Sequence, residues 1–189
     1  MTRNIDISEP IIKEGVRIFR PQEIELLISA IPKSDNQTKF EAMLYSGLRY
    51  VEGRRLYNNP QHFTGKTIKV VSKKTKATIK ERWVKLNKDG QLAVRYFLRG
   101  SANLPSYTSW RDDLKLWCKY AKISTKGISV KSTRKTWESW LIISFPEKTF
   151  EICLSQGHDE LTSLRHYVNL PFSTEEKEDI KTYTKGWGE

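Results

Sequence analysis

One segment near the end of the chain decides how the sequence is interpreted, and it reads Gln156-Gly157-His158-Asp159-Glu160-Leu161-Thr162-Ser163-Leu164-Arg165-His166-Tyr167. A glycine–histidine pair nine residues before a tyrosine has little specificity by itself. It becomes informative because two arginines lie upstream, Arg49 in Ser46-Gly47-Leu48-Arg49-Tyr50-Val51-Glu52 and Arg134 in Lys131-Ser132-Thr133-Arg134. These residue types together suit an attack on a phosphodiester.

Composition bounds the class of protein. The 189 residues suit one domain with appendages, and 38% hydrophobic with 29% charged residues predicts a packed core rather than global disorder. The 33 lysines and arginines exceed the 22 acidic residues and give a net charge of +11. This excess predicts a polyanionic partner, with nucleic acid first. The alternative is a basic protein whose charge only keeps it soluble.

The chain shows no signal peptide and no apolar run near the ~20 residues that span a bilayer, which predicts an intracellular protein without a membrane contact. Cys118 and Cys153 form no CxxC pair, so we expect two reduced, buried side chains. Two cysteines and the scattered His62, His158 and His166 lack the spacing of zinc ligands. The sequence therefore predicts neither a metal nor a cofactor.

Periodicity predicts a mainly α fold with a small antiparallel β-sheet or hairpin. Residues 1–20 show little periodicity and are interpreted as an N-terminal arm or lead-in, 21–172 as the main domain, and 173–189 as a C-terminal helix and tail. Helices are expected over 21–31, from a cap at Asp35 to Gly47, and over 49–57, 89–99 and 108–121, then after a cap at Ser129 and over 146–154. Residues 67–71 and 78–86 should pair as strands around a polar turn at 73–76. Ser173 should cap the last helix, and Trp110, Trp117, Trp137 and Trp140 should be core.

Side chains alone can break a phosphodiester if they meet three requirements. A nucleophile must lose its proton as it attacks, which Tyr167 can do while forming a covalent intermediate. Charge on the equatorial phosphate oxygens must be stabilised, and the planar forks of Arg49 and Arg134 match two oxygens each. The leaving oxygen needs a proton from a lysine or histidine. The residues predict phosphoryl transfer without a metal.

The pattern resembles the catalytic domain of tyrosine recombinases, the phage-integrase family. The family's first arginine lies in a Thr/Ser-Gly-Leu-Arg-x-x-Glu segment, which Ser46–Glu52 matches. Its catalytic lysine lies on a β-hairpin, its second arginine in His-x-x-Arg, and its tyrosine nine residues after a Gly-His pair. The order and spacing agree from Ser46 to Tyr167. The resemblance implies that family's catalytic-domain fold.

One position departs from the family pattern. Lys131 stands where most members have histidine, which replaces a titratable ring by a fixed cation at pH 7. This exchange resembles archaeal viral and plasmid integrases, as does the tail His166-Tyr167-Val168-Asn169-Leu170-Pro171-Phe172. Phosphate binding is compatible with lysine, whereas shared proton transfer there is in doubt.

The resemblance implies a role for each motif residue. Tyr167 would attack and become a 3′-phosphotyrosine, while Arg49 and Arg134 hold the non-bridging oxygens. Lys131 and His158 would hold phosphate and assist transfer of the tyrosine proton, and Glu52 would orient Arg49 or a neighbouring helix. A hairpin lysine would protonate the leaving 5′ oxygen. Strand alignment favours Lys73 and a Lys-Thr reading of the turn favours Lys74, with Lys76 and Lys80 as further alternatives.

The resemblance also implies partners and organisation. The substrate would be double-stranded DNA, and the reaction site-specific recombination that integrates or excises a mobile element. Family members assemble as a homotetramer on DNA and exchange C-terminal segments, for which the helix after Ser173 is the candidate; without DNA a monomer is expected. A helical DNA-clamping domain usually precedes the catalytic one, and residues 1–48 leave too little room for it. We therefore expect a catalytic half or a minimal protein.

Three other readings compete with a recombinase. The chain could be a basic DNA-binding module that no longer cuts, although no catalytic residue is missing from the sequence. A type IB topoisomerase-like enzyme would use the same residues to nick and close DNA. Asp112-Asp113 suggests a metal-dependent nuclease, but no third carboxylate is placed to complete its site.

Overall fold

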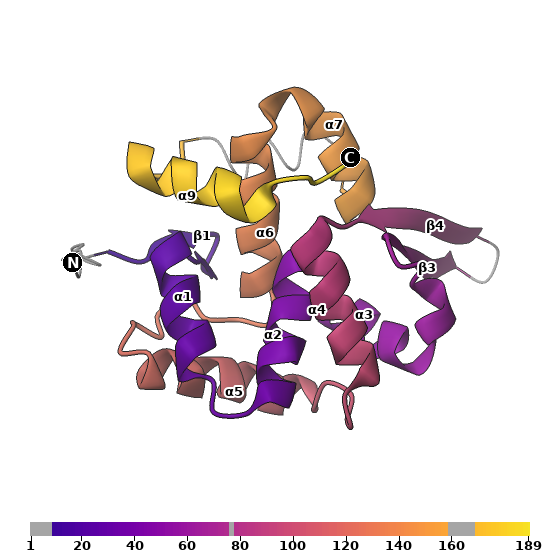
Figure 1. The fold of residues 1–189 in the computed structure, drawn as a ribbon, viewed down its shortest axis with the longest axis horizontal. Helices are drawn as coiled ribbons and strands as arrows, with labels where there is room; N and C mark the ends of the chain where they lie inside the picture. Colours follow the sequence, from indigo (N-terminus) through magenta and orange to yellow (C-terminus); the bar gives the residue numbers. More distant parts are fainter. Residues whose placement is uncertain (1–8, 76–77, 159–168) are drawn as a thin grey trace.

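The computed structural model describes residues 9–75, 78–158 and 169–189, and it places α6 (Ser132–Ser144) at the centre of a mainly helical fold (Figure 1). Trp137, Trp140 and Leu141 of this helix are fully buried. α2 (Ser34–Ser46), α9 (Thr174–Thr184) and strand β2 (Val16–Ile18) all contact α6. The predicted fold class is confirmed, because the rest consists of helices and two small antiparallel sheets.

The remaining helices among the described residues surround this centre (Figure 1). They are α1 (Pro21–Ala30), α3 (Tyr50–Asn58), α4 (Lys88–Arg99), α5 (Tyr107–Tyr120) and α7 (Thr149–Gln156), with short turns at Pro60–His62 and Pro146–Lys148. The capping box predicted at Ser173 is present, with Glu176 as its partner. Two predicted caps are wrong. Asp35 lies inside α2, and Lys131 rather than Ser129 caps α6, since the Ser129 hydroxyl accepts from the Lys131 backbone N–H instead.

The predicted hairpin is present and longer than expected. β3 (Thr67–Thr75) pairs antiparallel with β4 (Thr78–Lys85), and Thr67 lies opposite Lys85. Lys73 and Lys74 belong to β3, where the backbone of Lys73 pairs with Ile79, so the prediction of a polar turn at these two residues was wrong. The ladder continues to Thr75 opposite Thr78, with a shift in register between Lys73 and Thr75.

Residues 11–18 form a second hairpin that the sequence did not predict, since residues 1–20 were expected to form an arm. β1 (Ile11–Lys13) pairs with β2 (Val16–Ile18) across a turn with left-handed φ values of 50° at Glu14 and 73° at Gly15. Phe19 follows this hairpin; its backbone N–H donates to Thr136 Oγ1 at 2.9 Å and its carbonyl accepts from the Trp140 indole at 3.2 Å. Strands of three residues are too short to show periodicity, which is why the sequence missed them.

The C-terminal helix α9 packs on the same chain's α6. Ile180 and Trp187 are fully buried, and the Tyr183 ring lies 5.1 Å from that of Trp140. The Trp187 indole N–H donates to the Lys85 carbonyl at 3.1 Å, which links the tail to β4. In the part of the chain that the structure describes, no helix has both the length and the apolar character needed to cross a membrane. The division into arm, catalytic domain and exchange segment stays a prediction.

Candidate active site

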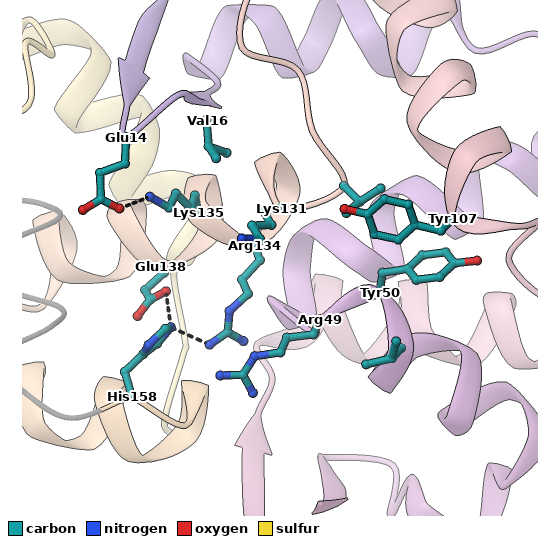
Figure 2. Close-up of a pocket in the computed structure, with 12 residues that line it drawn as sticks. Glu14, Val16, Arg49, Tyr50, Tyr107, Lys131, Arg134, Lys135, Glu138 and His158 are labelled. Carbon is teal, nitrogen blue, oxygen red and sulfur yellow. Dashed lines mark hydrogen bonds and ion pairs between the residues drawn. The ribbon is translucent and has the colours of Figure 1, made fainter.

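A pocket of about 400 Å³ lies between the start of α3, the first turns of α6 and the turn that follows α7. Four residues predicted from three distant segments line it together, namely Arg49, Lys131, Arg134 and His158 (Figure 2). Arg49 is the N-cap of α3, Lys131 is the N-cap of α6, and His158 follows the Gly157 C-cap of α7. The fold thus gathers the predicted cations around one cavity.

Arg134 is held by the ends of two helices. Its Nη1 donates to the Gly47 carbonyl at 2.7 Å and to Gln156 Oε1 at 3.2 Å, and its Nη2 donates to the Gln156 carbonyl. The residue is only 6% exposed. Carbonyls at helix C-termini carry partial negative charge and lack helical partners, so they suit a buried guanidinium. These contacts fix the orientation of the fork before any ligand binds.

Glycine is required at the two turns that serve the arginines. Gly47 and Gly157 end α2 and α7 with φ values of 60° and 72°, in the left-handed region. A Cβ on Gly47 would lie 2.5 Å from Gln156 Oε1, and one on Gly157 would lie 2.6 Å from Arg82 Nε. Backbone conformation and lack of space for a side chain therefore explain why glycine occupies these positions in the Ser-Gly-Leu-Arg and Gly-His motifs.

Arg49 reaches into the pocket from a capping box, and its side chain is 44% exposed. Glu52 accepts from the Arg49 backbone N–H at 2.8 Å and from Nη1 at 2.9 Å, so it orients Arg49 as the sequence predicted. Arg49 Nη2 also donates to the Gly157 carbonyl at 3.3 Å. Arg49 is thus the more accessible of the two arginines and is tied to the turn that carries His158.

His158 lies between a cation and a carboxylate (Figure 2). Its Nε2 is 2.7 Å from Arg134 Nη2 and 3.3 Å from Glu138 Oε2. Because a guanidinium only donates, a neutral ring accepts from Arg134 through Nε2, whereas a ring protonated there can donate to Glu138. Glu138, which is 1% exposed, was missed in the sequence because a glutamate one turn after Arg134 looks like an ordinary surface residue.

A second missed residue is Arg82 on β4. Its Nη2 donates to Glu52 Oε2 at 2.9 Å, so Glu52 binds two guanidiniums. Burial, with smaller contributions from the nearby charges of Arg134 and Arg49, lowers the pKa of Arg82 to about 10. A signal was present in the sequence, because Arg82 shares a strand face with the buried Val84 and Leu86.

The pocket also has an apolar side and a rim of opposite charge. Tyr50 and Tyr107 pack edge to face with their ring centroids 5.4 Å apart, and Tyr107 is half-exposed. On another side, Lys135 Nζ lies 3.0 Å from Glu14 Oε2 in the turn of the N-terminal hairpin. Glu14 belongs to the stretch that was expected to form an arm, so its place beside the pocket was not predicted.

The remaining predicted residues are placed only in part. Backbone pairing locates Lys73 and Lys74 on β3 and Lys80 on β4. Lys76 and the predicted nucleophile Tyr167 lie outside the described residues. Cys118 and Cys153 are both buried, as predicted. Within residues 9–75, 78–158 and 169–189, no group of three or more His, Cys, Asp or Glu side chains is arranged to hold a metal ion.

Chemically, the pocket is suited to a tetrahedral anion. It is lined by the guanidiniums of Arg49 at the start of α3 and Arg134 on α6, together with Lys131 at the start of α6. Backbone carbonyls and Glu52 hold the two guanidiniums in place. Planar forks bind phosphate oxygens in pairs, and preorganised cations stabilise charge that develops during reaction.

Comparison with known proteins supports the fold. No protein-family model and no curated protein matches the sequence. Among solved structures, XerA recombinase superposes on 89% of this chain with a TM-score of 0.64 and 16% identity. The Tn1549 transposon integrase (aa 82–397), in complex with circular intermediate DNA, superposes on 91% with a TM-score of 0.63 and 16% identity. The chain covers 65% and 66% of these two chains, slightly less than two thirds. Both are tyrosine recombinases, so the chain has the fold that the motifs implied.

Proposed function

We propose that this chain is the catalytic part of a site-specific DNA recombinase that cuts a strand with Tyr167 and rejoins it to a different strand. The observation that carries the proposal is the convergence of Arg49, Arg134 and His158 on one pocket in this fold. These residues are distant in sequence and sit where the motif spacing assigns them a shared task. A merely basic surface gives no reason for such convergence.

The proposed reaction exchanges one phosphate ester for another. The Tyr167 oxygen forms a bond to phosphorus, the bond to the 5′ oxygen breaks, and that oxygen takes a proton from a hairpin lysine, Lys73 or Lys74. Arg49 and Arg134 hold the non-bridging oxygens, while His158 accepts the tyrosine proton. In the second step a 5′ hydroxyl attacks the phosphotyrosine and gives its proton to the hairpin lysine, while the bond from phosphorus to Tyr167 breaks and the tyrosine oxygen regains its proton from His158. Because the ester bond is conserved, no external energy source is needed. In this proposal the arginines stabilise the charge on the phosphate, and the lysine and histidine transfer the protons, so these side chains take the tasks that a metal ion performs in other phosphoryl-transfer enzymes.

Lys131 supplies a permanent charge in this scheme. It lines the pocket and caps α6, so its ammonium enters from a fixed helix start. In this scheme Lys131 binds the phosphate as a point charge, and His158 and the hairpin lysine carry out the two proton transfers.

The proposed partner is double-stranded DNA of a mobile element, and the proposed assembly is a homotetramer on two sites. Support comes from the net charge of +11 and from the structurally similar Tn1549 transposon integrase, which was solved in complex with DNA. We further propose that α9 is the exchanged segment. Ile180 and Trp187 are buried against the chain's own core, and exchange between identical chains would recreate the same contacts in a neighbour.

The test is a covalent trapping assay on random-sequence DNA duplexes that carry a nick, since a nick lets the freed 5′ fragment diffuse away. Wild-type protein should form a protein–DNA adduct that survives denaturing electrophoresis and persists in chelator. Tyr167→Phe should abolish it, whereas Tyr120→Phe, which changes an exposed tyrosine on α5, should not. A wild-type protein that binds DNA without any adduct would instead identify a binding module. Plasmid relaxation without strand exchange would identify a topoisomerase.

A further inference from the structure

Glu52 joins two guanidiniums that come from different parts of the fold. Its Oε1 accepts from Arg49 Nη1 at 2.9 Å, while its Oε2 accepts from Arg82 Nη2 at 2.9 Å. The Glu52 and Arg82 side chains are only 6% and 13% exposed. The resulting chain Arg49–Glu52–Arg82 starts in the pocket and ends on the β3–β4 hairpin.

A contribution to the stability of the fold does not account for an arginine at the buried position 82. Its Nε and Nη1 are buried and have no hydrogen-bond partner among the described residues. Burial lowers its pKa to about 10, so the side chain stays charged at neutral pH in spite of the cost. A buried ion pair with unsatisfied donors is weak evidence for stabilisation, since apolar replacements often do as well. A role in fixing one specific arrangement accounts better for it.

Arg82 also contacts the turn that carries His158. A Cβ on Gly157 would lie 2.6 Å from Arg82 Nε, so glycine allows the guanidinium to approach the backbone there. The Gly157 carbonyl in turn accepts from Arg49 Nη2 at 3.3 Å. Arg82 therefore lies against both Glu52 and Gly157, the two groups that hold the Arg49 guanidinium.

The same residue anchors the hairpin. Arg82 pairs with Val70 on β3, and Lys73 stands three positions further along that strand, opposite Ile79. At about 3.3 Å per residue, the backbone of Lys73 is about 10 Å from this anchor. A shift of β4 relative to α3 would move the lysine-bearing strand and Arg49 apart.

We propose that Arg82 is a positioning residue that acts through Glu52 to hold the Arg49 guanidinium and the lysine-bearing hairpin in one arrangement. It touches neither substrate nor reacting atoms. The inference rests on the proposed function, because it assigns Arg82 to the same site. It predicts a loss of reaction rate rather than of DNA binding when Arg82 loses its charge.

The experiment compares Arg82→Met and Arg82→Lys with Lys85→Met. Lys85 is a matched control on the same strand, since it pairs with Glu151 on α7, outside the pocket. Arg82→Met should slow single-turnover adduct formation about 10- to 100-fold, the range for partners that orient a functional side chain, with DNA affinity near wild type. Arg82→Lys should recover part of the rate, and Lys85→Met should match wild type. The double variant Arg82→Met/Glu52→Gln should be no slower than Glu52→Gln alone.

Amide hydrogen exchange gives a readout that does not depend on activity. The Arg49 N–H donates to Glu52 Oε2, so it should exchange faster in Arg82→Met than in wild type or Lys85→Met. If wild-type protein forms no adduct, the proposed function fails and this exchange rate alone decides the role of Arg82. A wild-type adduct rate in Arg82→Met, an equal loss in Lys85→Met, or unchanged exchange at Arg49 would overturn the proposal.

Discussion

The carbonyl oxygen of Gly47 accepts a 2.7 Å hydrogen bond from Arg134 Nη1, across 87 positions of sequence. A second contact of this kind is present, because Arg49, two residues after Gly47, donates to the Gly157 carbonyl at 3.3 Å. Arg134 thus binds the turn that ends α2 in the Arg49 motif, whereas Arg49 binds the turn that ends α7 in the His158 motif. These two contacts tie α2, α3, α6 and α7 together at the pocket.

Replacing Arg134 by lysine should damage both reaction and stability. Lysine keeps the charge but loses the planar fork, so it leaves the Gly47 or Gln156 carbonyl without its donor. We expect adduct formation to fall by about 10²–10³, as for loss of one preorganised donor. We expect the free energy of unfolding to fall by about 1–3 kcal/mol. Single-turnover trapping and urea unfolding measure the two effects.

The matched control is Arg111→Lys on α5. Arg111 forms an ion pair with Asp112 at 3.0 Å on an exposed helix face, where such pairs contribute little. It should leave rate and stability near wild type. An Arg134→Lys protein as active as this control would refute the assigned role of the fork.

The substitution Gly157→Ala separates backbone strain from steric conflict. An alanine at a left-handed φ costs about 1–2 kcal/mol wherever it stands. At Gly157 the new Cβ would also meet Arg82 Nε, which should add about 1–3 kcal/mol. Gly15→Ala is the control, since Gly15 has nearly the same φ, 73° against 72°, and a Cβ there would have nothing within 4 Å. If Gly157→Ala and Gly15→Ala lose the same free energy of unfolding, a Cβ at position 157 has no steric conflict with Arg82.

Alkaline pH should destabilise the protein through Cys118. Burial raises the pKa of this thiol from 9.0 to about 12. The unfolded chain therefore ionises first, and the free energy of unfolding should fall as pH rises from 9 to 12, by at most about 1.4 kcal/mol per pH unit for this proton. Burial raises the pKa of Tyr45 and Tyr183 as well, so their contribution has the same sign above pH 10. Urea unfolding of wild type and Cys118→Ala between pH 9 and 10 isolates the thiol, and identical slopes would contradict its burial.

Restoring histidine at position 131 should make the rate depend on pH. A histidine there binds phosphate well only while protonated, so the adduct rate of Lys131→His should fall as pH rises through about 6.5. Lys131→Met should be slow at every pH. The ratio of each variant's rate to the wild-type rate between pH 5.5 and 8 removes the pH effects that the two proteins share from the comparison. A pH-independent ratio for Lys131→His would show that residue 131 does not contact the phosphate.

The sequence predicted the helices and strands that are specified by a local cap or by a periodic pattern over many residues. The capping box at Ser173, the Pro21 helix and the alternation around Trp83 each specify their own backbone, so they were found. The hairpin at Ile11–Ile18 was not found, because three-residue strands have no periodicity and are stabilised by distant contacts such as Trp140 with Phe19. The prediction that Ser129 caps α6 was wrong, because its hydroxyl accepts a hydrogen bond from the Lys131 N–H, before the first turn of the helix.

The site was predictable where chemistry forces a residue type at a fixed spacing. Arg49, Arg134 and His158 met this condition, and the structure brings them to one pocket. Arg82 and Glu138 did not, since their roles depend on which face of a strand or helix meets the pocket. Only the packed fold shows that Glu138 lies 3.3 Å from His158.

The central claim concerns one covalent bond, and identifying it is the most direct test. Wild-type adduct on random-sequence nicked duplexes should be digested with nuclease and protease and sequenced by mass spectrometry. We predict a single nucleotide joined through its 3′ phosphate to Tyr167, with a 5′ hydroxyl on the released strand. Attachment to another residue, or a 5′ phosphate link, would contradict the account.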